Sequence, residues 1–207
     1  MKLIWNGHSC YTIETESGNV VFDPYEDNYV PGLAPLQLQA DCVYCSHQHP
    51  DHGASQKVTL TGAPCHVTVE TIDTFHDPEQ GALRGTNTIH ILSAEGMRVA
   101  HLGDLGCTLT PEQKEKLQGL DALLIPVGGF YTIDAHEAKA LVDELKPRVV
   151  IPMHYRGDGF GFDVIDEVRT FTSLCDHVVY APENYLELTS ETPEQICVLT
   201  LSQFSRR

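Results

Sequence analysis

Residues 46–53 of this 207-residue chain read Ser-His-Gln-His-Pro-Asp-His-Gly. Three imidazoles and a carboxylate therefore fall within six positions, directly after the apolar run 42–45, which has the pattern of a buried strand. Imidazole nitrogen and carboxylate oxygen are ligands that zinc and similar divalent ions take from proteins. A lone histidine in a polar turn is common, but a cluster at ligand spacing predicts a metal site.

The spacing within this cluster favours two ions. In an extended segment, His47 and His49 point to the same side, because side chains repeat every second residue. Once the chain turns, Asp51 and His52 face a second position, which suits a two-metal site. We therefore predict two neighbouring divalent ions, with zinc as the first candidate and manganese, nickel or iron as alternatives.

Composition limits the function classes. The chain is 42% hydrophobic and 20% charged, which predicts one globular domain over residues 1–207. Its net charge of −16 repels phosphate backbones, so we expect a small-molecule substrate and no extended nucleic-acid partner. No apolar run approaches the length of a bilayer span, and no signal peptide is recognisable, so we expect a cytoplasmic protein with no membrane partner. A homo-oligomer remains an open alternative.

Strand patterns fill the first half of the chain and alternate with helix patterns in the second. Strands are predicted at 2–5, 10–14, 20–23, 41–46, 64–70, 85–93, 97–102, 122–127, 148–152, 178–180 and 196–201. Helices are predicted at 111–118, 134–145 and 163–171, with another opening within 51–59. Asp134 is expected to cap the second of these helices. This order indicates two mixed β-sheets with helices outside them.

Further ligands are expected where later strands end. His76 follows a strand-like run and lies among turn-forming residues, where functional groups gather. His66 and His90 fall inside strand patterns, where a side chain points into a sheet face. We therefore select His76 as the third imidazole for the first metal.

Asp104 and His154 complete the predicted site. Asp104 follows the strand pattern 97–102 and Gly103, so its carboxylate has no core to stabilise and is predicted to bridge the metals. His154 ends the buried run 149–153, as His47 ends the run 42–45, and is assigned to the second metal. The predicted ligands are thus His47, His49, Asp51, His52, His76, Asp104 and His154.

The order of these motifs resembles the metallo-β-lactamase-fold hydrolase superfamily. Segments 7–11, 23–24, 84–88, 101–106, 126–134 and 151–155 resemble in particular the branch that contains L-ascorbate-6-phosphate lactonase. The resemblance covers nearly the whole chain. It implies an α/β fold, a four-layer αβ/βα sandwich of two mixed β-sheets with helices outside and the metals at one edge of the sheets.

The ligand set and the resemblance predict a metal-dependent hydrolase. Two metals sharing Asp104 would lower the pKa of a bridging water and supply hydroxide, with Asp51 orienting this nucleophile. Asp51 and Asp104 are therefore the predicted catalytic residues. The predicted substrate is a small-molecule ester, lactone, amide or phosphodiester. The alternatives are an RNA-processing phosphodiesterase, which the acidic surface argues against, and a non-catalytic metal-binding or sensor protein.

Other residues are predicted to support the ligands or line the substrate pocket. Asp23 is the first candidate for fixing an imidazole tautomer, because its strand end precedes Pro24 and the resemblance places it beside the metal loop. The remaining candidates are His8 and His101 behind the ligands, and Arg84, Tyr131 and Thr132 in the pocket. Whether His101 itself contacts a metal is left open.

Overall fold

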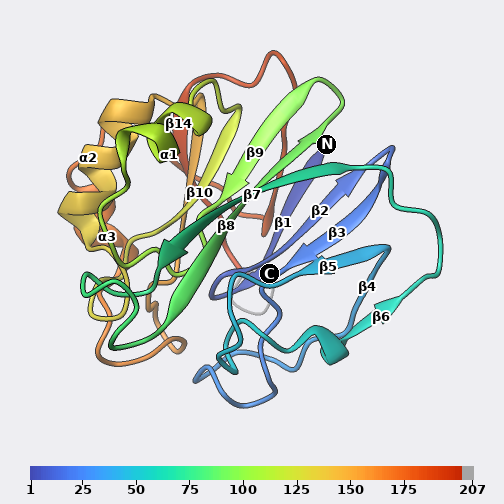
Figure 1. Cartoon of the computed structure of the whole chain (residues 1–207), viewed down its shortest axis with the longest axis horizontal. Helices are drawn as coiled ribbons and strands as arrows, with labels where there is room; N and C mark the ends of the chain where they lie inside the picture. Colours follow the sequence, from blue (N-terminus) through green and yellow to red (C-terminus); the bar gives the residue numbers. More distant parts are fainter. Residues whose placement is uncertain (202–207) are drawn as a thin grey trace.

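Two mixed β-sheets form the frame of this protein, whose computed structural model describes residues 1–201 (Figure 1). One sheet has the strand order β13-β1-β2-β3-β5, in which β1, β2 and β3 form an antiparallel meander and β5 runs parallel to β3. Its strands are β1 (Lys2–Gly7), β2 (Cys10–Thr15), β3 (Gly18–Phe22), β5 (Cys42–Tyr44) and β13 (Tyr185–Glu187).

The second sheet has seven strands in the order β12-β14-β11-β10-β9-β8-β7. The run from β12 to β9 is parallel, whereas β7 and β8 join as antiparallel neighbours. Its strands are β7 (Thr68–Phe75), β8 (Thr86–Ala94), β9 (Met97–His101), β10 (Ala122–Pro126), β11 (Val149–Met153), β12 (Val178–Tyr180) and β14 (Gln195–Val198). A separate parallel pair joins β4 (Leu38–Ala40) to β6 (Val58–Leu60).

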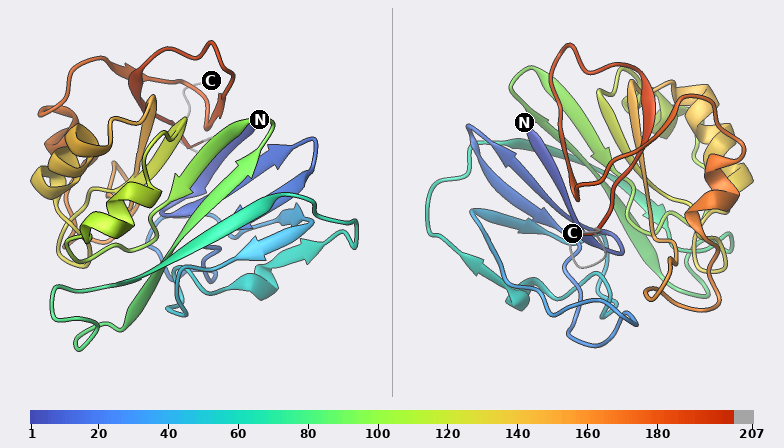
Figure 2. Two further views of the ribbon diagram at one scale, coloured as in Figure 1. Left: turned by 45° about the horizontal axis from the view of Figure 1, so that its top comes forward. Right: turned by 180° about the vertical axis from the view of Figure 1, so that it is seen from behind.

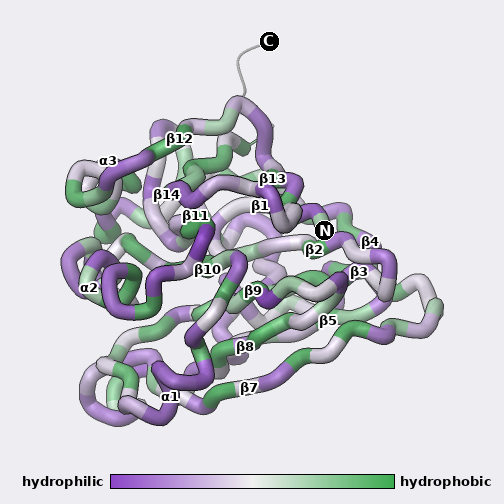
Figure 3. Tube along the Cα trace, turned by 90° about the horizontal axis from the view of Figure 1, so that it is seen from above, coloured by the Kyte–Doolittle hydropathy of each residue, from purple (hydrophilic) through white to green (hydrophobic). Residues whose placement is uncertain are grey.

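The core lies between the two sheets. Trp5, Tyr11 and Phe22 from the five-stranded sheet join Ile89 and Leu123 from the seven-stranded sheet in one buried cluster. Figure 3 shows hydrophobic residues within β8 and β9. All residues of β10 and β11 are buried, which is the pattern of central parallel strands covered on both faces.

The helices lie together beside the seven-stranded sheet (Figure 2). Within residues 1–201 these are α1 (Pro111–Lys116), α2 (Ala135–Leu145) and α3 (Val168–Thr172). Asp134 caps α2 as predicted, since its carboxylate accepts from the backbone N–H groups of His136 and Glu137. None of these helices has the length and apolar character needed to span a membrane.

The prediction of a helix within 51–59 is wrong. Only Ser55–Lys57 forms a short 3-10 helix, and β6 follows it directly. The preceding backbone is used for a tight turn, in which the N–H groups of His52 and Gly53 both donate to the His49 carbonyl. The histidine cluster is therefore held by a loop.

The helix expected at 163–171 is shortened to Val168–Thr172. Its first residues make tertiary backbone contacts instead, because Asp166 N–H donates to the Gly128 carbonyl. The strand expected at 64–70 starts later and runs over Thr68–Phe75. Strands β4, β6 and β13, of three residues each, were not predicted.

Replacement of a glycine beside the sheet edge tests whether its close contacts constrain the fold. Gly103 has φ +56°, and an added Cβ would clash with Asn87 Oδ1 and the Ser46 side chain; Gly96 has φ +72° but open space around it. Either Ala substitution should lose about 1–2 kcal/mol of unfolding free energy through left-handed strain. Gly103→Ala should lose about 1–3 kcal/mol more through the clash.

Urea unfolding of the two metal-free variants measures this difference. Equal losses for Gly103→Ala and Gly96→Ala would show that the contacts around Gly103 do not constrain the fold.

Candidate metal centre

The predicted ligands come from strand ends that meet at one edge of both sheets. The loop carrying His47, His49, Asp51 and His52 follows β5 in the five-stranded sheet. In the seven-stranded sheet, His76 follows β7, Asp104 follows β9 and His154 follows β11. Residues far apart in the sequence are thereby brought together.

Asp104 lies at the centre of this group. Its Oδ2 is 3.1 Å from His52 Nε2 and 3.3 Å from the Nε2 atoms of both His76 and His154. His47 Nε2 is 3.9 Å from the same oxygen. One buried carboxylate oxygen thus faces imidazoles from both predicted metal positions, as a bridging ligand requires.

Asn87 fixes the position of Asp104. Its side-chain oxygen accepts a hydrogen bond of 2.9 Å from the Asp104 backbone N–H. Its amide nitrogen donates to Thr74 Oγ1 at 2.8 Å and to the Leu102 carbonyl at 3.0 Å. The Asn87 side chain therefore ties the turn after β9 to Thr74 in β7. This role of Asn87 was not predicted from the sequence.

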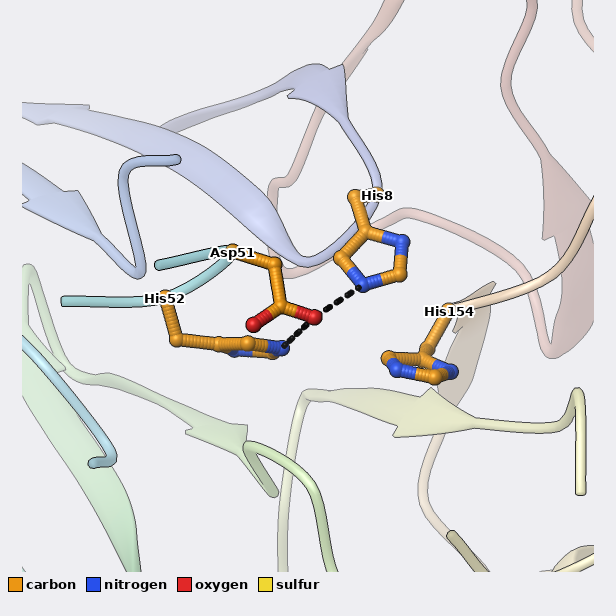
Figure 4. A group of neighbouring side chains, drawn as sticks. All are labelled: His8, Asp51, His52 and His154. Carbon is orange, nitrogen blue, oxygen red and sulfur yellow. Dashed lines mark ion pairs between the residues drawn. The ribbon is translucent and has the colours of Figure 1, made fainter. Parts of the chain in front are cut away.

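The donor atoms form two separate compact groups, each of which contributes imidazoles that face Asp104. His47, His49 and His76 have ligand atoms within 4.8 Å of one another, which matches the predicted first position. A second group of the same compactness contains His8, Asp51, His52 and His154 (Figure 4). His49 is exposed, whereas the members of the second group are buried, so solvent reaches the first position more readily.

Unpaired polar atoms indicate that this donor set fits metal ions. Buried polar atoms normally have hydrogen-bond partners. Within residues 1–201, those lacking one are concentrated here and include His8 Nδ1 and Nε2, His47 Nε2, His52 Nε2, His76 Nδ1, Asp104 Oδ1, and His154 Nδ1 and Nε2. Divalent cations would satisfy several of these donors at once.

The electrostatics of the site agree with this fit. Burial, followed by the charge of His52, lowers the pKa of His47 to about 3, so its imidazole keeps a free lone pair. Burial and His154 likewise lower the pKa of His8 to about 4. Burial raises the pKa of Asp104, but His154 and His52 outweigh it and hold that pKa well below its usual range. His47 and His8 are thus neutral beside anionic carboxylates, which is the form that zinc-like ions bind. His52 differs: burial lowers its pKa, but Asp104, Asp51 and Asp23 outweigh burial and raise it well above its usual value, so this ring must release its proton before it can bind a metal.

Asp23 and Ser46 orient two of the imidazoles. Asp23 accepts hydrogen bonds from Ser46 N–H at 2.6 Å, from Ser46 Oγ at 2.6 Å and from His52 Nδ1 at 2.7 Å. Since the Ser46 hydroxyl donates to Asp23, it accepts from His47 Nδ1 at 2.9 Å. Both rings therefore turn Nε2 towards Asp104. Sequence reasoning found Asp23 but missed Ser46, although its place between the strand and the first histidine was visible.

His101 lies behind the ligands. Its Nε2 donates to the Ser9 carbonyl at 2.8 Å, and its Nδ1 accepts from Gly103 N–H at 3.1 Å. Both ring nitrogens are therefore engaged, and the ring links β9 to the turn between β1 and β2. This arrangement suits a residue that positions the ligands. Asp23, which orients His52, lies beside the same ring, with its Oδ2 4.0 Å from His101 Nδ1.

The predicted pocket residues differ in what their side chains contact. The Tyr131 ring centre lies 6.5 Å from that of His154, and the Arg84 guanidinium lies 5.7 Å from the Tyr131 ring centre. The Thr132 hydroxyl instead donates to the Ile133 carbonyl. Phe162, which sequence reasoning missed, lies 5.5 Å from His8 and 6.1 Å from Tyr131 between ring centres. An aromatic wall therefore adjoins the second group of ligands.

The part of the chain that carries the predicted ligands also matches a known family. Residues 2–154 match the family model described as the beta-lactamase superfamily domain. The chain belongs to the beta-lactamase superfamily. The family match spans the strands and loops that supply every predicted ligand, including His154 at its final position.

Relatives agree with this assignment. A UPF0173 metal-dependent hydrolase of Thermoplasma acidophilum is 29% identical over 188 residues, covering 75% of this chain and 83% of the relative. A crystal structure from Thermotoga maritima, assigned to the Zn-dependent hydrolases of the metallo-β-lactamase superfamily, is 34% identical with a TM-score of 0.76, covering 96% and 97% of the two chains. The metallo hydrolase Igni18 of Ignicoccus hospitalis, at 22% identity and TM-score 0.60 over 84% and 89%, shares the fold. The predicted α/β sandwich of two mixed sheets is confirmed, although within residues 1–201 the α-helices lie beside the seven-stranded sheet and do not form a fourth layer on the other sheet. The chain is a metal-dependent hydrolase.

The choice of His76 among the later histidines can be tested. Because its Nε2 faces Asp104, His76→Ala should remove an imidazole from the first metal position and abolish tight binding there. His66 is exposed outside the cluster, so His66→Ala should bind metal normally. His101→Ala should lower stability and weaken metal binding by at most about 10- to 100-fold, as expected for a residue behind the ligands.

Metal titration with elemental analysis of the three variants distinguishes these roles. Loss of the first metal from His101→Ala, with normal binding by His76→Ala, would reverse the assignment.

Proposed function

We propose that this protein is a dinuclear hydrolase, with zinc as the first candidate metal, that cleaves a small-molecule ester, lactone, amide or phosphodiester. The observation that carries the proposal is the position of Asp104. Its buried carboxylate oxygen lies within 4 Å of imidazoles belonging to two compact donor groups. A single ion would leave one of these groups unused.

Each metal position has its own ligands in this proposal. His47, His49 and His76 would hold the first ion, and Asp51, His52 and His154 would hold the second. Asp104 would be shared by both. When bound, a pair of divalent ions supplies hydroxide at neutral pH and Lewis-acid polarisation of a carbonyl or phosphoryl oxygen.

The chain's own residues would orient the reactants. Asp51 is buried beside His8 and His52, and although burial raises its pKa, the charge of His52 outweighs it and keeps the carboxylate anionic. A carboxylate oxygen so placed can accept a hydrogen bond from the attacking water and fix its direction. Asp23 and Ser46 hold the imidazoles in one tautomer, so no ligand has to reorganise during the reaction.

The surroundings favour a small substrate. Tyr131 and Phe162 form an apolar wall that would pack against the substrate and exclude water. Arg84, beside Tyr131, offers a cation to an anionic substituent. The net charge of −16 disfavours the binding of long RNA, so the charge of the chain does not support the nuclease alternative. Lactones and other esters are the first compounds to test, because the motif resemblance includes a lactonase branch.

Metal content and the bridging carboxylate provide the test. The wild-type protein should bind about two divalent ions per chain. Asp104→Ala should weaken both and lower hydrolysis on the order of a thousandfold or more, because Lewis-acid activation contributes several kcal/mol to transition-state stabilisation. His49→Ala should cause a similar loss, and the double variant should lose little more.

The measurements are elemental analysis and turnover on a panel of lactones, esters, amides and phosphodiesters. His136→Ala, on the exposed side of α2, is the matched control and should behave as wild type. Near-normal turnover and metal content in folded Asp104→Ala would contradict the bridge. A wild type with two metals and no turnover on any class would favour the sensor alternative.

A further inference from the structure

We infer that His8 is itself a ligand of the second metal position, which is therefore built from four side chains besides the bridging Asp104. This inference rests on the proposed dinuclear function and extends it. The four side chains are His8, Asp51, His52 and His154.

His8 reaches the site from a different element than the other ligands. It lies in the turn between β1 and β2, and its Nε2 is 3.4 Å from Asp51 Oδ2. Its ring centre is 4.1 Å from that of His154. Figure 4 shows the side chains of His8, Asp51, His52 and His154 gathered around a common space. Their ligand atoms all lie within 4.8 Å of one another, so one ion can reach all four.

The backbone is distorted in a way that directs His8 into this space. The pairing of β1 with β2 shifts register between Trp5 and Gly7, and bulges of this kind re-aim side chains next to active sites. His8 then adopts φ +50°, a left-handed conformation that costs a residue with a Cβ about 1–2 kcal/mol. Glycine or asparagine would suit such a turn better. A histidine in this conformation therefore points to a role for its ring.

The backbone of His8 is also anchored. The Trp5 indole N–H donates to the His8 carbonyl at 2.9 Å, and His154 N–H approaches the same oxygen at 3.4 Å. His154 shares the left-handed conformation, with φ +53°. Two strained histidines, one from each sheet, are thus held against each other with their rings in the same space.

The ring nitrogens of His8 lack the partners that a structural histidine would have. The side chain is fully buried, yet neither nitrogen makes a hydrogen bond of standard geometry within residues 1–201. His101, which is equally buried, uses both of its nitrogens. An unpaired buried polar group costs about 1–3 kcal/mol, and coordination of an ion by Nε2 would remove this cost for one nitrogen.

With His8 as a fourth side chain, the second metal position differs from the first in its number of protein donors. With Asp104, the first position has four protein donors, which is the tetrahedral number for zinc. The second would have five, before any solvent or substrate binds. We therefore expect the second position to hold a five- or six-coordinate ion and to accept manganese, iron, nickel or cobalt more readily than the first.

The test compares two histidine-to-glycine variants. His177 also has a left-handed backbone, with φ +54°, but is exposed and outside the metal centre, so His177→Gly is the matched control for relief of strain. In Co²⁺ titrations, His8→Gly should bind the first ion normally and the second about 100-fold more weakly or worse, beyond the loss typical of a residue behind the ligands. His177→Gly should bind both ions like wild type.

The visible spectrum of bound Co²⁺ supplies a readout of coordination that does not depend on turnover. His8→Gly should alter the absorption of the second ion, and free imidazole, which fits the space left by the ring, should restore it. Circular dichroism of the metal-free variants checks folding. If His8→Gly does not fold, His8→Asn, which retains a residue suited to left-handed backbone, takes its place.

Each outcome has one meaning. Normal second-site affinity and an unchanged spectrum in the His8 variant would overturn the inference and leave the dinuclear hydrolase proposal intact. A moderate loss of affinity with an unchanged spectrum would also overturn it, because His8 would then only position Asp51. At most one bound ion in the wild type would contradict the proposed function itself.

Discussion

Burial of the Asp104 carboxylate is the constraint on which the rest of the site depends. A carboxylate without solvent is costly unless positive charge or hydrogen bonds compensate it. Imidazoles from both sheets surround this group, and its pKa stays low despite burial because His154 and His52 face it. The sheet edge therefore combines an anionic centre with several imidazoles, and cations at this place would compensate the carboxylate and engage the unpaired ring nitrogens.

The fold delivers that centre through the ends of strands. Strands β5, β7, β9 and β11 all end at the same edge, so each ligand needs only a short loop to reach it. Asp23 links the five-stranded sheet to the metal loop through Ser46 and His52. Asn87 performs the corresponding role in the seven-stranded sheet by holding Asp104. Rigid strands and a small set of hydrogen bonds thus preorganise the site, as efficient catalysis requires.

Much of this arrangement could be predicted from the sequence because ligand chemistry leaves a local pattern. The cluster at 47–52 and the strand-end positions of His76, Asp104 and His154 were enough to assemble seven predicted ligands that the structure brings together. His8 was placed behind them, because nothing in Gly7-His8-Ser9 reveals the shift in register that turns its ring inwards. Ser46, Asn87 and Phe162 escaped notice for a similar reason, since their roles arise from contacts between distant segments. The helix expected within 51–59 did not form, and the helix expected at 163–171 is shorter than predicted. In both segments, backbone hydrogen bonds of loops replace helical ones.

Sharing of Asp104 by two metals is the feature on which the proposed function depends. A crystal structure of the zinc-loaded protein, with diffraction data recorded on both sides of the zinc absorption edge, tests it most directly. Two anomalous peaks are expected to flank the Asp104 carboxylate, one among His47, His49 and His76 and the other among Asp51, His52 and His154. A single peak, or two peaks of which only one contacts Asp104, would contradict this arrangement.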